Sequence, residues 1–181
     1  MKVNSVSTPL KSRITGAVYF LSLLMGEFGD YIFHDKAHTA GLLEISGMVV
    51  VTLLVYVIFK PVNKILALLA LFLNLVAMVF EAQSVNPHGQ SVGLIIHGLY
   101  VLVFAYLIFR STFMPQILSV LMALAGLGWV TYLSTPFPRI NLIFCLLGEV
   151  SVMLWLLVMG VKEQRWTEQS RAAETSARAR A

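Results

Sequence analysis

The sequence has few charged residues. Only 12% of its 181 residues are Asp, Glu, Lys or Arg, whereas 58% are hydrophobic, and the mean hydropathy is +0.82. Soluble domains carry about 25% charged residues, so this chain lacks the polar side chains that would cover a globule in water. The shortage excludes a soluble enzyme, a disordered chain and a nucleic-acid-binding domain. What it leaves is a multi-pass protein whose surface contacts a lipid bilayer.

Cysteine and the motifs of common enzymes are also scarce. The single cysteine, Cys145, has no partner for an internal disulfide and lies in an apolar run, where it is expected to be a small buried hydrophobe. The sequence has no phosphate-binding loop, dinucleotide fingerprint or nucleophile elbow. Function must therefore be inferred from polar residues within the apolar segments.

Six apolar segments account for most of the chain, and its six prolines lie outside their interiors. A helix needs about 20 apolar residues to cross the hydrocarbon core of a bilayer, and proline interrupts helix interiors. The pattern predicts an all-α bundle of six transmembrane helices over residues 14–161. The segments are residues 14–33, 39–59, 65–83, 91–109, 116–133 and 140–161.

Two tails flank this predicted bundle. Residues 1–13 form a basic N-terminal tail, and residues 162–181 form a basic C-terminal tail without an apolar face, expected to be disordered or a frayed helical extension. Of the 13 Lys and Arg residues, all but Lys36 and Arg139 lie in the tails or in the second and fourth loops. Basic flanks stay in the cytoplasm, so both termini are predicted to be cytoplasmic.

Acidic residues within the apolar segments are the main functional signal. Each charged group inside a membrane costs about 2.5–3.5 kcal/mol on insertion scales, so each one requires a reason. With the orientation above, these acids and the one clearly intramembrane histidine all fall in the outer half. Helical spacing aligns them as polar stripes on several helices, and polar stripes face a bundle interior. We therefore expect an outward-facing pocket lined by Glu27, Asp30, Asn74, Glu81, His97, Tyr100 and Glu149, with Glu44 a weaker member.

Three functions are compatible with such a pocket. The leading hypothesis is a protein that binds a small or lipidic ligand as a carrier, sensor or accessory subunit. A second is an intramembrane enzyme in which Glu149 and either Glu27 or Asp30 act as general acid and base. A third is a structural subunit that binds a protein partner. A carrier would need a route to the cytoplasm past Asn74, and homo-oligomerisation stays open.

Metal and cofactor binding are weakly indicated. His34 and His38 could form a pair of metal ligands at a helix end, but the sequence has no HExxH or CxxC spacing. His97 alone does not make the facing pair that bis-histidine haem ligation requires. The cofactor is therefore left undetermined by the sequence.

Two long stretches resemble a known family. YLIFRSTFMPQILSVLMALAGLGWVTYLS at residues 106–134 and GEVSVMLWLLVMGVKEQRWTEQ at residues 148–169 are similar to signatures of family 4386 of bacterial domains of unknown function. Weaker similarity begins near Arg13 and at Lys60. The resemblance implies a multi-pass protein of the bacterial cytoplasmic membrane. It supplies no catalytic residue, and Gln116 and Ser119 depart from the Arg and Gly expected there.

Overall fold

The chain folds into helices and connecting turns. The computed structural model describes residues 7–33, 37–82, 87–134 and 138–179; of residues 26–33, 37–38, 87–91 and 138 it describes the backbone alone. This part of the chain is all-α, as predicted. Its helices are α1 (Thr8–Phe33), α2 (Ala37–Phe59), α3 (Lys64–Ala82), α4 (Pro87–Arg110), α5 (Gln116–Thr131), α6 (Pro138–Val158) and α7 (Glu163–Arg178).

Proline and glycine mark the ends of these helices. Pro87 and Pro138 are the first residues of α4 and α6, where a missing backbone N–H leaves no hydrogen bond unmade. Pro115 caps α5 in an extended conformation. After α6, Gly160 takes a φ of 66°, which is readily available to glycine, and its N–H donates to the Trp155 carbonyl. This turn separates α6 from α7.

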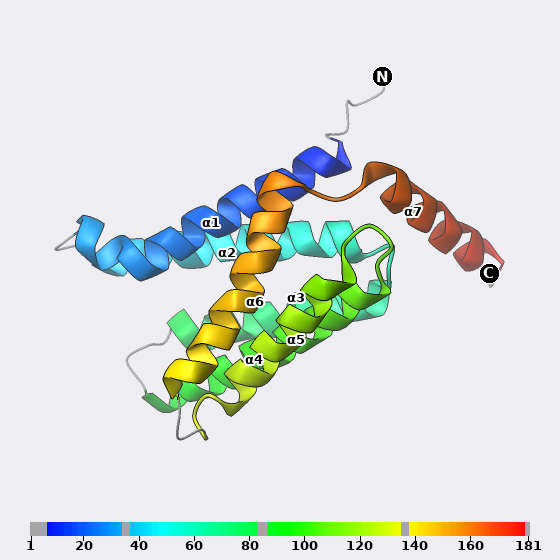
Figure 1. Cartoon of the computed structure of the whole chain (residues 1–181). Coiled ribbons are helices and arrows are strands. Elements are labelled where there is room, and N and C mark those ends of the chain that lie inside the picture. Colours follow the sequence, from blue (N-terminus) through cyan, green and yellow to red (C-terminus); the bar gives the residue numbers. More distant parts are fainter. Residues whose placement is uncertain (1–6, 34–36, 83–86, 135–137, 180–181) are drawn as a thin grey trace.

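Helices α1 to α6 form a closed ring in which each contacts its neighbours in the chain. α1 and α2 pair as one hairpin, α3, α4 and α5 pack side by side, and α6 crosses between the two groups to contact both α5 and α1 (Figure 1). The start of α1 and the whole of α7 lie at the same end. We call this the basic end, defined by α7 and the turns at residues 60–63 and 111–115.

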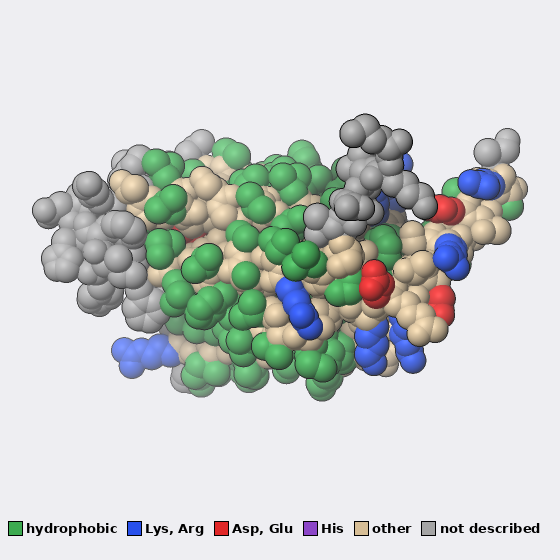
Figure 2. Space-filling view, turned by 90° about the horizontal axis from the view of Figure 1, so that it is seen from above, with side chains coloured by type: hydrophobic (Ala, Val, Ile, Leu, Met, Phe, Trp, Pro, Cys, Tyr) green, Lys and Arg blue, Asp and Glu red, His purple; other side chains and the backbone are tan. Residues whose placement is uncertain are grey.

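The outside of the ring is apolar. Ile65, Phe72 and Ile143 are each more than 60% exposed, and Figure 2 shows hydrophobic side chains covering the middle of the molecule while most charged ones gather towards α7. Among the described residues, four stretches of helix are long and apolar enough to cross a membrane: Thr39–Phe59, Lys64–Ala82, Val92–Arg110 and Arg139–Val158. α5 is apolar but shorter. Such a surface suits lipid rather than water.

Aromatic rings fill the interior near the basic end. Phe59 of α2 is fully buried, with its ring 5.1 Å from that of Phe104 and 5.4 Å from that of Phe113. Tyr100 stacks on Phe104 one turn closer to the opposite end, at 6.0 Å. We call Phe59, Phe104 and Phe113 the aromatic plug. Because buried aromatic pairs add specific contacts to apolar burial, the plug holds α2 and α4 together there.

The C-terminal tail differs from its expected disorder or fraying. Residues 163–178 form α7, which is separate from α6 and attached to the basic end by side chains near its start. The Trp166 indole donates to the Ile58 carbonyl at 2.8 Å. Gln169 accepts from the backbone and hydroxyl of Thr112, both at 3.1 Å. These contacts involve the last turn of α2 and the turn at residues 111–115, so α7 covers the basic end.

Candidate functional site

A chain of polar contacts joins all six helices of the ring. Each helix contributes one side chain, and we call the set the polar network. Its members are Tyr19 from α1, Thr52 from α2, Asn74 from α3, His97 from α4, Trp129 from α5 and Glu149 from α6. Hydrogen bonds that are shielded from water contribute strongly to stability, because the polar groups have no water molecule as an alternative partner. The polar network thus joins segments far apart in the sequence.

Glu149 is the centre of the polar network. Its Oε2 accepts from the Tyr19 hydroxyl at 2.6 Å, and its Oε1 accepts from the Trp129 indole N–H at 2.5 Å. His97 Nε2 lies 3.4 Å from the same Oε1. Glu149 is only 7% exposed. A buried carboxylate is tolerated when its oxygens are satisfied, and here three aromatic or imidazole groups do so.

Thr52 and Asn74 determine which ring nitrogen of His97 carries a hydrogen. The Thr52 hydroxyl donates to the Met48 carbonyl, so its oxygen accepts from Asn74 Nδ2 at 2.6 Å. The Asn74 Oδ1 then faces His97 Nδ1 at 3.2 Å. Because an amide oxygen only accepts, Nδ1 carries a hydrogen and donates. One further proton must lie between His97 Nε2 and Glu149 Oε1, and with it the pair has zero net charge.

Small residues on α3 allow this convergence. Its buried face consists of Ala67, Ala70, Asn74, Ala77 and Met78. Alanines at helical spacing let neighbouring backbones approach closely in a membrane. The amide of Asn74 can therefore reach α2 on one side and α4 on the other. The sequence thus provides a narrow helix face with one polar residue at its middle.

A cavity of about 610 Å³ lies beside the polar network, on the side away from the basic end. Asn74, His97 and Glu149 of the polar network contribute polar groups to its lining. Apolar side chains from α1, α2, α3, α4 and α6 supply its walls: Leu23, Leu42, Ile45, Met48, Met78, Leu94, Leu142 and Leu146. Ligand pockets in proteins have volumes of about 300–1,000 Å³ and combine apolar walls with a few polar groups.

Two further carboxylates line the same cavity. Glu44 comes from the first half of α2, and Glu81 comes from the last turn of α3. Glu81 is half-buried and makes no hydrogen bond or ion pair with any described residue. The described lining holds no Lys or Arg. Its electrostatic character is therefore acidic.

The structure brings several of the predicted site residues together. His97 contacts both Asn74 and Glu149, and Glu81 lines the cavity beside them. Tyr100 lies outside the cavity lining, with its ring 5.6 Å from that of His97. The backbone of Glu27 and Asp30 lies in α1, but their side chains are outside the described part of the chain.

The histidines proposed as metal ligands cannot be placed. His34 and the side chain of His38 lie outside the described residues. Within the part of the chain that is described, no group of three or more His, Cys, Asp or Glu residues is arranged to hold a metal ion.

Three members of the polar network were not identified from the sequence. Trp129 has the pattern of an interfacial aromatic, and Tyr19 and Thr52 are common residue types in membrane helices. Thr52 also satisfies its own hydroxyl through the preceding turn. None of the three carries a charge that marks it as exceptional. Only the packing of six helices reveals their partners.

The fold and the apolar exterior define a multi-pass helical membrane protein. Residues 78–160 match the family described as domain of unknown function (DUF4386), which confirms the family resemblance over that part of the chain. An uncharacterised protein of Archaeoglobus fulgidus is 27% identical over 128 residues, covering 63% of this chain and 77% of the relative. No solved structure matches the chain. The matched residues include His97, Trp129 and Glu149.

Proposed function

We propose that the cavity beside the polar network binds an amphipathic organic cation. The observation that carries the proposal is the Glu81 carboxylate, which pairs with no described residue and lies in a cavity whose described lining has apolar walls and no Lys or Arg. A protonated amine would pair with Glu81, and its hydrocarbon part would contact the leucine and methionine side chains. Glu149 is less suited to hold the cation because its oxygens already accept from Tyr19 and Trp129.

The proposed setting is the bacterial cytoplasmic membrane, which the chain would cross six times with both termini in the cytoplasm. The support is the concentration of Lys and Arg around the basic end and the even number of helices in the ring. The cavity would then face the outside of the cell. A ligand would enter it from the outer surface or the outer leaflet.

Among the ligand-binding roles, a sensor or accessory subunit fits better than a carrier. A carrier needs a route past Asn74 towards the basic end. In this conformation the Tyr100, Phe104 and Phe59 side chains follow His97 along the bundle interior, and all three are buried. We therefore favour binding without release on the other side.

A pair of matched amphiphiles tests the proposal. Decylamine, which is protonated at neutral pH, and decanoate have similar tails and opposite charges. Purified protein should be stabilised against heat by decylamine and much less by decanoate, since ligands that bind the folded state raise its stability. Glu81→Gln should weaken decylamine binding about tenfold, as expected for one partly screened ion pair.

Glu168→Gln on α7 provides the matched control. It removes the same charge from an exposed position far from the cavity lining. Equal stabilisation by both amphiphiles, or equal weakening by Glu81→Gln and Glu168→Gln, would overturn the proposal.

The enzyme and scaffold hypotheses stay predictions. The enzyme hypothesis assigns the second catalytic group beside Glu149 to Glu27 or Asp30, and the side chains of these two residues are outside the described part of the chain. Glu149 and His97 form a pair with zero net charge, which supports a role in holding helices together rather than in exchanging protons with a substrate.

A further inference from the structure

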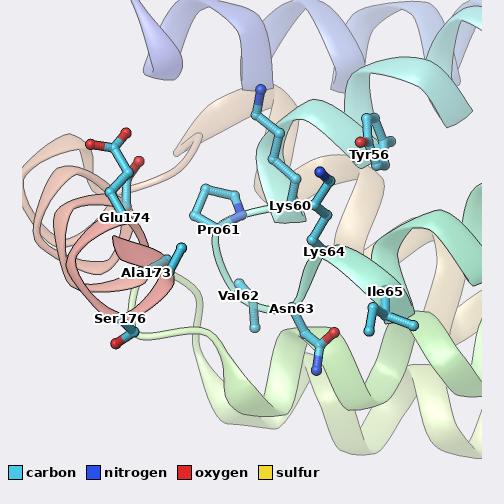
Figure 3. A pocket seen from close by; sticks show the side chains of 12 residues that line it. Tyr56, Lys60, Pro61, Val62, Asn63, Lys64, Ile65, Ala173, Glu174 and Ser176 are labelled. Atoms are coloured by element: carbon cyan, nitrogen blue, oxygen red, sulfur yellow. The ribbon is translucent and has the colours of Figure 1, made fainter. Parts of the chain in front are cut away.

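A second cavity lies at the basic end, independent of the first. It has a volume of about 740 Å³ and lies between the turn joining α2 to α3 and the second half of α7 (Figure 3). Lys60 lines it from the turn, Lys64 lines it from the start of α3, and Ser170, Ala173 and Glu174 line it from α7. The α7 wall is held in place by the hydrogen bond from Trp166 to Ile58.

The two lysines make this cavity suitable for an anion. Their amino groups point to the same side of the turn in Figure 3, and neither has a described acidic side chain within ion-pair distance. Glu174 and the Ser170 hydroxyl on the opposite wall can accept hydrogen bonds. The cavity therefore combines two ammonium groups for a phosphate with acceptors for a hydroxyl-bearing group.

The cavity continues onto the lipid-facing surface of α3. Ile65 lines the cavity and is 79% exposed. Leu68, Leu69 and Phe72 follow at helical spacing on the same face and are also exposed. A molecule whose charged group occupied the cavity would find an apolar track for a hydrocarbon chain directly beside it. This continuity favours a lipid over a free phosphate ion.

We propose that this cavity binds the headgroup of an anionic phospholipid of the phosphatidylglycerol type. Lys60 and Lys64 hold the phosphodiester, Glu174 and Ser170 accept from the glycerol hydroxyls, and an acyl chain lies along Ile65, Leu68 and Phe72. Basic pockets next to membrane helices are suited to anionic headgroups. The bound lipid would join α7 to the transmembrane ring.

Native mass spectrometry of the whole chain tests this site, in detergent micelles that contain both phosphatidylglycerol and phosphatidylcholine. The wild-type protein should retain phosphatidylglycerol preferentially. Lys60→Gln combined with Lys64→Gln should reduce that preference about 10- to 30-fold. Ala173→Trp should also reduce it, because the indole would occupy part of the cavity beside the lysines without changing the charge.

The control variant combines Arg13→Gln with Lys162→Gln, which removes two charges from the same end outside the cavity lining. Retained preference in this variant supports a defined site. Equal loss in the control, or retention by Ala173→Trp, would mean diffuse attraction and would overturn the proposal. Release of the lipid by millimolar inorganic phosphate would instead identify a site for a soluble anion and refute the lipid assignment.

Discussion

Trp129 and Trp155 are both half-buried in the bundle, and their indole N–H groups differ in hydrogen bonding. The Trp129 indole donates to Glu149, whereas Trp155 Nε1 is buried with no hydrogen-bond partner among the described residues. A hydrogen bond to a charged group contributes about 1.5–3 kcal/mol, while a buried donor without a partner costs about 1–3 kcal/mol. Replacement by phenylalanine removes the indole N–H in both cases, so it isolates the value of that hydrogen bond.

Trp129→Phe should therefore destabilise the protein more than Trp155→Phe. We expect the midpoint of thermal unfolding in detergent to fall by about 4–10 °C for Trp129→Phe, because Glu149 loses a donor. Trp155→Phe removes an N–H that has no described partner, and this gain offsets the loss of packing. The fall in its unfolding midpoint should be less than half as large. Equal falls would show that ring packing, not the hydrogen bond to Glu149, determines the effect.

The sequence allowed half of the polar network to be predicted. Asn74, His97 and Glu149 could be identified because polar groups in apolar segments require partners. Tyr19, Thr52 and Trp129 could not be identified, because such side chains are common at lipid-facing, interfacial and core positions alike. Which partner each side chain meets depends on how its helix is rotated about its axis. A helix that is apolar on all sides has no amphipathic pattern from which this rotation could be predicted.

At the scale of the helices, the crossing of α1 and α6 depends on Gly16. A Cβ atom at this position would overlap the backbone of Leu156 and Leu157 in α6. Backbone atoms cannot rotate away as a side chain does, so the two helices would have to separate. This contact closes the ring, because α6 is the element that joins the α1–α2 hairpin to α5.

Gly16→Ala should accordingly lower stability by about 1–3 kcal/mol, as overpacking of a tight contact does. Gly41 in α2 is the matched control, because a Cβ there would meet no atom of the described residues within 4 Å. Gly41→Ala should be neutral or stabilise by up to about 1 kcal/mol through its helix propensity. Chemical denaturation of both variants in the same detergent measures the difference. Similar losses would contradict close packing at Gly16.

Helix positions were largely predictable, and the exceptions have local causes. Proline and apolar length located the six helices of the ring, with shifts of a few residues at their ends. α1 starts at Thr8, earlier than predicted, and within this added part the Ser12 and Thr15 hydroxyls donate to carbonyls of the preceding turn. α7 could not be recognised, since its attachment depends on hydrogen bonds made by Trp166 and Gln169 rather than on a repeated apolar face.

Considered as a whole, the molecule has two unlike ends. The basic end is filled by the aromatic plug and covered by α7, whereas the cavity with Glu44 and Glu81 lies towards the other end. This asymmetry gives the bundle a direction across the membrane. The excess of Lys and Arg at the basic end predicts which way it points.

Cysteine labelling in intact cells tests that direction. In a Cys145→Ala background, Thr175→Cys marks α7 and Arg139→Cys marks the opposite end, and both positions are exposed. A membrane-impermeant maleimide should label Arg139→Cys in intact cells but label Thr175→Cys only after permeabilisation, because basic segments are retained in the cytoplasm. Cys145 itself is buried and should stay unlabelled in the unsubstituted chain. The reverse pattern would place the cavity on the cytoplasmic side, and labelling of both sites in intact cells would contradict a ring that crosses the membrane from end to end.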